Sequence, residues 1–331
     1  MMPVAIVTGF LGSGKTTLIS RILRDPAFAR TAVIVNEFGE IGLDHELIAG
    51  SDETLLTLTT GCLCCAVRSD LIATLLDLER RRAAGEVVYD RVLIETSGLA
   101  DPAPILHALM TDRDIASQHA IDGIITVVDA LHGEAALDRH PEARRQAALA
   151  DTLLLSKTDL AAPNDELIAR LASLNPGATR QFARDIVPTT LFAGTGAVAR
   201  LATLPEPSSR NPFSRARHSD GIETFVLRRD RPLPALALTL LLEALAEHCG
   251  ARLLRLKGLV DIAEMPGQPA VIHGVQHVVS PPKFLDRWPS SDHTTRMVFI
   301  AQGIPRHFPA RLLDAIEYEV REEMERQATP R

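Results

Sequence analysis

The stretch GFLGSGKT, from Gly9 to Thr16, decides the fold, because it fits the phosphate-loop pattern G-x-x-x-x-G-K-[ST]. The apolar run Val4–Thr8 precedes it and a helical pattern follows it, which is the context that such a loop needs. Glycines let backbone N–H groups close around a phosphate, and a helix N-terminus adds free donors. We expect Lys15 to reach the β- and γ-phosphates and the Thr16 hydroxyl to ligate Mg²⁺.

The residues that follow alternate between apolar runs and helical patterns. Runs rich in Val, Ile and Leu lie at 31–37, 54–60, 89–96, 121–130 and 151–159, and helix-like sequence separates them. Near-continuous apolar strands of this kind are typical of a parallel sheet that is buried on both sides. The sequence therefore predicts an α/β fold, with a parallel sheet covered by helices on both faces.

The last third of the chain has a different pattern. Residues 203–220, TLPEPSSRNPFSRARHSD, are rich in Pro, Ser and Arg, which is typical of a linker. Beyond them, strands and helices do not alternate strictly, which favours a smaller α+β domain with an antiparallel sheet. We predict a nucleotide-binding domain at 1–202, a linker at 203–220 and a C-terminal domain at 221–331.

The segment SKTD, from Ser156 to Asp159, indicates which nucleotide is bound. It follows a predicted strand and matches N-K-x-D with Ser in place of Asn. The Asp159 carboxylate would accept hydrogen bonds from N1–H and the 2-amino group of guanine, a pair of donors that adenine lacks. The Lys157 stem would cover the face of the base. The sheet is then that of a P-loop GTPase; a polar exit from the strand is the alternative.

The segment ETSGLADP begins with Glu95 at the end of a predicted strand. An acidic residue there, beside the phosphate loop, would hold Mg²⁺ directly or through water. Gly98 would offer its N–H to the γ-phosphate, so that this segment would distinguish GTP from GDP. An ordinary strand-to-loop turn is the alternative.

Three cysteines, Cys62, Cys64 and Cys65, crowd into the segment GCLCC, and the fourth, Cys249, is distant. Clustered cysteines in a chain without a secretory signal favour metal binding or redox chemistry over structural disulfides. Zinc prefers four ligands, so three thiolates leave a position open, as expected of a site that hands its metal on. A redox switch and a purely packed role are the alternatives.

Glu37 and Glu40, in NEFGEIGLD, lie in the predicted first switch. They would position the attacking water, contact Mg²⁺ or supply an outer ligand to the thiol-bound metal. A solvated acidic loop is the alternative.

Together the segments GFLGSGKTT, VNEFGEIGLD, GCLCC, ETSGLADP and SKTD, in this order, resemble the CobW-like GTPases, relatives of the nickel-insertion GTPases of urease and hydrogenase maturation. RLLRLKGLVDI and the region 288–300 extend the resemblance into the second domain. The resemblance implies a GTP-binding metallochaperone that hydrolyses GTP to gate the transfer of zinc, or in some members cobalt, to client metalloproteins.

The resemblance also assigns roles by position. Nucleotide binding is implied for Glu95 and Gly98, and from the residues themselves we expect catalytic roles for Lys15, Glu37, Glu95 and Gly98. Zinc would bind to Cys62, Cys64 and Cys65, and magnesium to Thr16. The nucleotide-binding residues that it implies are Gly9, Gly12, Ser13, Gly14, Lys15, Thr16, Thr17, Ser156, Lys157 and Asp159.

Composition narrows the remaining classes. The 331 residues carry a net charge of −7 and are 46% hydrophobic, which argues for packed cores and against a nucleic-acid partner. We find no secretory signal and no apolar stretch of membrane-spanning length, so we expect a cytoplasmic protein without a membrane partner. A client metalloprotein and a nucleotide-dependent homodimer are the expected partners.

Three other functions remain open from the sequence. A cobalt-handling factor in cobalamin biosynthesis or metalloenzyme activation would share the chemistry but not the client. A P-loop phosphotransferase with a structural zinc would act on a small acceptor substrate and would have no need of the SKTD segment. A GTP-dependent scaffold would release no phosphate. His273 and His277, four residues apart in a predicted strand, are a weaker candidate for a second metal site.

Overall fold

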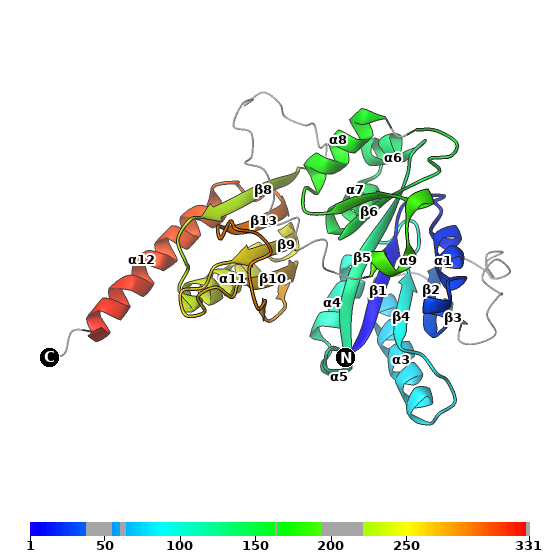
Figure 1. Cartoon of the computed structure of the whole chain (residues 1–331), viewed down its shortest axis with the longest axis horizontal. Helices are drawn as coiled ribbons and strands as arrows, with labels where there is room; N and C mark the ends of the chain where they lie inside the picture. Colours follow the sequence, from blue (N-terminus) through cyan, green and yellow to red (C-terminus); the bar gives the residue numbers. More distant parts are fainter. Residues whose placement is uncertain (38–54, 60–63, 163, 193–220, 329–331) are drawn as a thin grey trace. The chain divides into compact units, whose positions relative to one another are not determined.

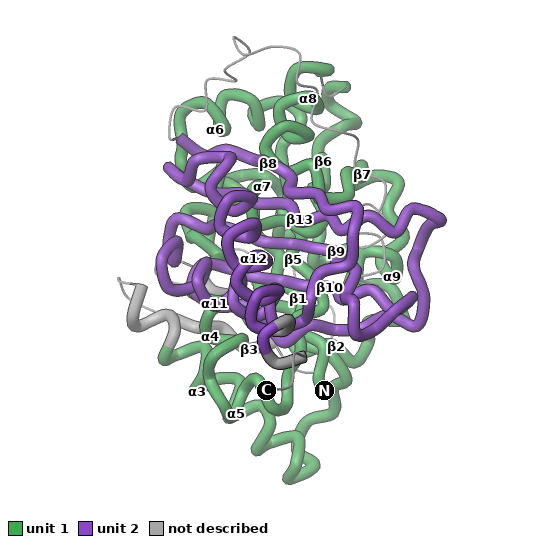
Figure 2. The backbone as a smooth tube through the Cα atoms, turned by 90° about the vertical axis from the view of Figure 1, so that its left-hand side faces the viewer, with its two compact units in different colours: residues 1–194 green, residues 195–331 purple. Residues whose placement is uncertain are grey.

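The computed structural model describes residues 1–37, 55–59, 64–162, 164–192 and 221–328 (Figure 1). These residues form two compact units, 1–194 and 195–331, which Figure 2 draws in different colours. The predicted linker 203–220 and its boundaries lie outside the described residues and stay a prediction. None of the helices in the described ranges is long and apolar enough to cross a membrane.

The first unit is built on one parallel sheet of seven strands in the order β3-β2-β4-β1-β5-β6-β7. This sheet confirms the predicted α/β class. The strands are β1 (Met2–Thr8), β2 (Thr31–Glu37), β3 (Leu55–Thr59), β4 (Arg91–Glu95), β5 (His119–Asp129), β6 (Thr152–Ser156) and β7 (Thr179–Phe182).

Helices cover both faces of this sheet (Figure 1). On one face α1 and α9 pack against alternate strand residues such as Val7, Val35 and Val127. On the other face lie α3, α4 and α7. The helices are α1 (Lys15–Leu23), α3 (Cys64–Ala83), α4 (Ala103–Thr111), α5 (Arg113–Gln118), α6 (Gly133–Arg139), α7 (Pro141–Leu149), α8 (Asp165–Leu174) and α9 (Pro188–Leu191).

Burial on both sides explains why these strands are apolar almost throughout. Val4, Ile6 and Val7 in β1, the central strand of the seven, are fully excluded from solvent. Each such side chain contributes about 2 kcal/mol when it leaves water. Because all the strands are parallel, their carboxyl ends lie along one edge, and ligands of such sheets bind outside that edge.

The second unit is a separate antiparallel sheet covered on one face by two helices, which confirms the predicted α+β domain. Its main strand order is β11-β10-β9-β13-β8, and β12 pairs with β10. The elements are β8 (Ile222–Arg229), α11 (Ala235–Cys249), β9 (Leu253–Val260), β10 (Ala270–Val275), β11 (Val278–Val279), β12 (Lys283–Phe284), β13 (Thr295–Gln302) and α12 (Phe308–Ala328).

One predicted strand of this unit is wrong. Residues 270–279 form two antiparallel strands, with the turn at Gln276 and His277, instead of one strand. Gln276 takes the left-handed backbone conformation, with φ of 53°. His273 and His277 therefore do not share a face of one strand.

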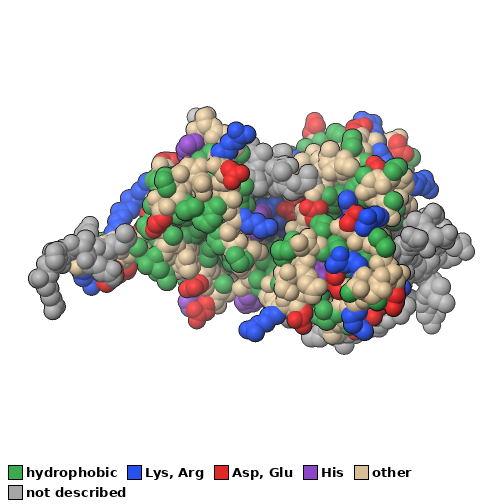
Figure 3. Space-filling model, turned by 60° about the horizontal axis from the view of Figure 1, so that its bottom comes forward, with side chains coloured by type: hydrophobic (Ala, Val, Ile, Leu, Met, Phe, Trp, Pro, Cys, Tyr) green, Lys and Arg blue, Asp and Glu red, His purple; other side chains and the backbone are tan. Residues whose placement is uncertain are grey.

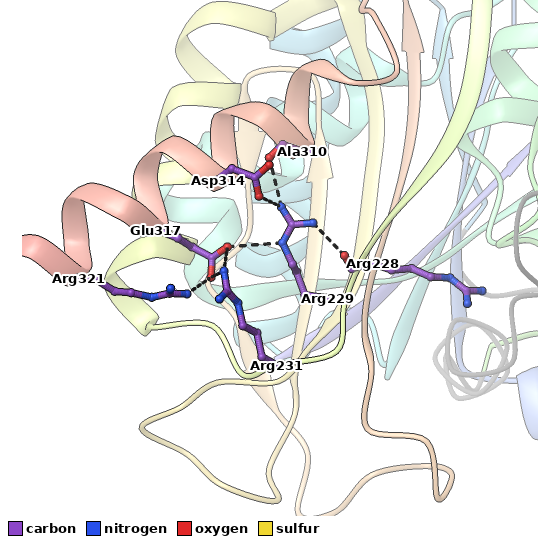
Figure 4. A network of polar contacts seen from close by, with 7 residues as sticks. All are labelled: Arg228, Arg229, Arg231, Ala310, Asp314, Glu317 and Arg321. Carbon is purple, nitrogen blue, oxygen red and sulfur yellow. Dashed lines mark hydrogen bonds and ion pairs between the residues drawn. The ribbon is translucent and has the colours of Figure 1, made fainter.

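A buried carboxylate holds α12 against β8 in this unit (Figure 4). Glu317 is 1% exposed and accepts contacts from three guanidinium groups. Their nitrogens lie 3.5 Å away for Arg229, 3.4 Å for Arg231 and 3.4 Å for Arg321. Arg229 also donates to Asp314 at 2.5 Å, at the exposed side of the cluster. The charge of Glu317 is thus paired from several sides.

We predict that Glu317→Gln lowers the free energy of unfolding of the second unit by about 2–3 kcal/mol, because it leaves several cations around a neutral side chain. The matched change Asp314→Asn, at an exposed partner of Arg229, should cost less than about 1 kcal/mol. Trp288, the only tryptophan, is packed in this unit, so urea unfolding followed by its fluorescence measures both. Equal effects of the two changes would contradict the prediction.

On the face drawn in Figure 3, acidic and basic side chains are interspersed with apolar and neutral ones. Neither positive nor negative side chains dominate in that view.

Candidate nucleotide site

The phosphate loop connects β1 to α1 at the carboxyl edge of the first sheet. Three of its glycines, Gly9, Gly12 and Gly14, have positive φ values of 148°, 69° and 95°. At Gly9 a Cβ atom would also lie 2.3 Å from the Val127 carbonyl oxygen, so no other residue fits. These glycines let the loop turn so that α1 begins at once, with the free N–H groups of its first turn beside the loop.

Lys15 is the first residue of α1 and is buried. Its ammonium group donates to the carbonyl oxygens of Gly9 at 3.0 Å and Phe10 at 3.4 Å. The positive charge therefore lies within the curve of the loop, where it would meet the β- and γ-phosphates of a bound nucleotide.

Thr16 and Glu95 come from α1 and β4 and meet beside the loop. The Thr16 hydroxyl donates to Glu95 Oε1 at 3.0 Å, and Glu95 is buried at the end of its strand. A hydroxyl and a carboxylate are hard oxygen ligands of the kind that Mg²⁺ prefers. The pair therefore fits a magnesium ion, which would bridge phosphate oxygens and neutralise their charge.

The segment after β4 is hydrogen-bonded to the end of β1 and lies against the phosphate loop. The Thr96 N–H donates to the Val7 carbonyl at 3.0 Å, and the Thr96 hydroxyl donates to the Thr8 hydroxyl at 2.7 Å. A Cβ on Gly98 would lie 2.8 Å from both the N and Cα of Leu11, so the two backbones are in direct contact. Gly98 thus lies beside the phosphate loop, as a γ-phosphate sensor requires.

Gln146 holds this segment from behind, and no sequence pattern singled it out. Its side chain is fully buried in α7, and its Nε2 donates to the carbonyls of Gly98 at 3.2 Å and Ala100 at 2.9 Å. Its own backbone carbonyl accepts a hydrogen bond of 2.7 Å from Thr126 in β5. Gln146 thereby ties the Gly98 segment, held by its side chain, to β5, which is bonded to its backbone carbonyl.

The SKTD segment lies on the other side of the loop. The Ser156 hydroxyl donates to the Ser13 carbonyl at 2.6 Å, so it pins the phosphate loop although it stands where Asn is more usual. Lys157 has a left-handed backbone with φ of 56° and pairs with Asp129 at 2.7 Å. Asp159 is exposed, as a side chain that meets a base must be.

The charge of Asp129 is stabilised by its neighbours. Burial disfavours its charged form, but the hydrogen bond from Lys157 and those from the Leu131 and His132 N–H groups outweigh burial and lower its pKa. Asp129 therefore stays ionised and fixes the Lys157 ammonium group at the carboxyl edge of the sheet.

The predicted metal motif is placed only through its flanking elements. Cys62 and Glu40 lie outside the described residues, while Cys64 and Cys65 are the first two residues of α3. Glu37 is the last residue of β2, and its backbone pairs with Thr59, the last residue of β3. No side-chain geometry is described for these residues.

Strand order brings the predicted segments side by side. β2 lies between β3, which leads to the cysteines, and β4, which leads to Glu95 and Gly98. β4 in turn lies beside β1, which leads to the phosphate loop. The cysteine, switch and phosphate segments therefore begin at consecutive strands along one edge.

A loop, helix and sheet arranged in this way define a P-loop nucleotide-binding protein. Two family models match the chain: "CobW/HypB/UreG, nucleotide-binding domain" over residues 3–181, and "Cobalamin synthesis protein cobW C-terminal domain" over residues 222–317. The chain belongs to the CobW family. The predicted family and enzyme class, a P-loop GTPase, are thereby confirmed.

Similar proteins cover nearly the whole chain. The zinc chaperone YjiA of Escherichia coli strain K12 is 33% identical over 309 residues, which are 92% of this chain and 96% of YjiA. The zinc chaperone CobW of Pseudomonas aeruginosa is 34% identical, over 92% of this chain and 88% of its own length. The crystal structure of Zn(II)-bound YjiA GTPase matches with a TM-score of 0.71 and 28% identity, over 95% of this chain and 98% of that one.

We predict that Gly98→Ala reduces kcat/KM for GTP by about tenfold or more, because the new Cβ would push the Gly98 segment away from the backbone of Leu11. Gly123→Ala in β5 is the control, since nothing lies within 4 Å of a Cβ there. Phosphate release at varied GTP concentrations measures both variants. Parent-like GTP turnover by Gly98→Ala would show that the close contact between Gly98 and Leu11 is not required for hydrolysis.

Proposed function

We propose that the protein is a GTP-driven zinc chaperone: it binds zinc at the motif of Cys62, Cys64 and Cys65, and GTP binding and hydrolysis gate the transfer of that zinc to a client metalloprotein. The observation that supports this most is the strand order β3-β2-β4-β1, which starts the cysteine, switch and phosphate segments next to one another. The names of its relatives, zinc chaperones, agree with the cargo.

Guanine is the base that the site favours. Asp159 is exposed at the end of the loop after β6, and Ser156 fastens the same loop to Ser13. Its carboxylate would accept the N1–H and 2-amino donors of guanine. An adenine in the same place would leave Asp159 without matching donors.

The nucleotide would act through two groups. The Gly98 N–H would meet the γ-phosphate, and Mg²⁺ at Thr16 and Glu95 would bridge phosphate oxygens. Because β4 lies beside β2, a shift in the Gly98 segment would pass to Glu37 and from there to the neighbouring cysteine segment. GTP would then tighten the zinc site, and hydrolysis would loosen it.

Two different groups would fill the fourth coordination position of the zinc, one after the other. Glu37, at the end of β2, is one candidate ligand, and a group of the client is the other. A ligand supplied by the client would draw zinc out of the three-thiolate site when GTP is hydrolysed. Cytoplasmic location and a nucleotide-dependent homodimer remain parts of this proposal.

Native mass spectrometry of the full chain with Mg²⁺-GTP and zinc tests the proposed function. We expect the parent to bind GTP and zinc together and Cys64→Ala to lose zinc. Cys249→Ala is the matched control, because Cys249 is a buried thiol of the second unit, and it should keep both ligands. Zinc retained by Cys64→Ala as tightly as by the parent would refute the assigned motif. Replacing zinc by cobalt in the same experiment shows which metal the site prefers.

We predict that Asp159→Ala weakens GTP binding by about tenfold to a hundredfold, since it removes two hydrogen bonds to a charged acceptor. Asp165→Ala, which removes the same charge from an exposed site in α8, should bind GTP as the parent does. Calorimetry with GTP, ITP and ATP measures the effect, because ITP lacks the 2-amino group. A parent that binds ATP and GTP equally would favour the phosphotransferase instead.

A further inference from the structure

A cavity of about 340 Å³ lies behind the phosphate loop, on the face of the sheet that α6 and α7 cover. Its walls come from residues 10–13 of the loop, residues 126–129 of β5 and the inward sides of the two helices. A volume of this size is typical of small-molecule sites. Gly12, Ser13 and Lys157 line it, whereas Gly14, Lys15 and Thr16 at the start of α1 do not, so the cavity adjoins the predicted nucleotide residues from the side away from α1.

The walls of the cavity are mainly apolar. Leu11, Val127, Ala136, Leu137 and Ala143 supply the aliphatic surface. At one side the ring of Phe10 stacks on the imidazole of His140, with 4.4 Å between the ring centroids. A flat, apolar or aromatic group would fit such walls.

The polar groups of the cavity favour negative charge. Arg139 and His132 are exposed at its lining, and neither has a carboxylate partner among the ion pairs of the described residues. The one carboxylate in the lining, Asp129, already pairs with Lys157 at 2.7 Å. An anionic group on a ligand would therefore meet a cation without meeting an uncompensated carboxylate.

We propose that this cavity is a second ligand site, which binds a small aromatic anion: the aromatic part against Phe10, Leu11 and Ala136, and the anionic group at Arg139. This site goes beyond the proposed zinc function and does not depend on it.

Binding there is coupled to the nucleotide. The cavity shares residues 10–13 with the phosphate loop, and its lining includes Gln146, whose amide holds the carbonyls of Gly98 and Ala100. A ligand that presses on these groups shifts the two segments that contact the phosphates. By linkage, bound nucleotide must then change the affinity of the cavity for its ligand.

The probes for the test are 8-anilinonaphthalene-1-sulfonate, an aromatic anion, and N-phenyl-1-naphthylamine, which has the same rings without the charge. Both become fluorescent in apolar surroundings, so titration of the full chain gives a Kd for each. The variants are Arg139→Gln, which removes the cation, and Ala136→Phe, which fills the cavity. Arg113→Gln, an exposed arginine of α5, is the matched control.

We expect the parent to bind one sulfonate probe per chain, and Arg139→Gln to weaken it about tenfold while the neutral probe and Arg113→Gln change less than about twofold. Ala136→Phe should abolish both probes at this site while GTP binding shows that the variant is folded. Saturating GDP should change the Kd of the sulfonate probe at least about threefold. Unchanged sulfonate binding in Arg139→Gln would refute the anion site, and equal Kd values with and without GDP would refute the coupling.

Discussion

The contact on which the first unit depends is the close approach of two backbones, those of Gly98 and Leu11. A Cβ at residue 98 would stand 2.8 Å from Leu11 atoms, so the Gly98 segment and the phosphate loop touch with nothing between them. Gln146 maintains the contact from behind by bonding the carbonyls of Gly98 and Ala100. Any movement of one segment must therefore displace the other, which is the property that a nucleotide switch needs.

The sheet extends that contact sideways. In the order β3-β2-β4-β1 each strand delivers one segment to the carboxyl edge, so the path from the phosphate loop to the cysteines crosses three strand pairs. Parallel pairing keeps the strand ends in register, as Glu37 with Thr59 and Val35 with Glu95 show. The proposed coupling between nucleotide and zinc would then run between segments that start at neighbouring strands of one sheet.

The sequence predicted those features whose chemistry is local. The glycines at 9, 12 and 14, the lysine and threonine after them and the buried strands follow from short patterns, and the structure has the loop and strands there. Gln146 escaped prediction because its partners lie about 46 residues or more away in the chain, and a lone glutamine in a helix carries no signal. The turn at Gln276 was not predicted because it places a non-glycine residue at positive φ. The strand β7 was not predicted either, because its four residues are too few to give a clear pattern. The roles of the cysteines remain predictions of the sequence.

The most direct test of the account is the zinc affinity of the full chain, measured with a competing chelator in saturating non-hydrolysable GTP analogue and in saturating GDP. If the switch and cysteine segments act as one unit, the GTP-analogue complex should bind zinc at least about tenfold more tightly than the GDP complex does. By linkage, zinc should then favour the GTP analogue over GDP by the same factor. Equal zinc affinity in the two nucleotide states would contradict the coupling, whatever the rate of GTP hydrolysis.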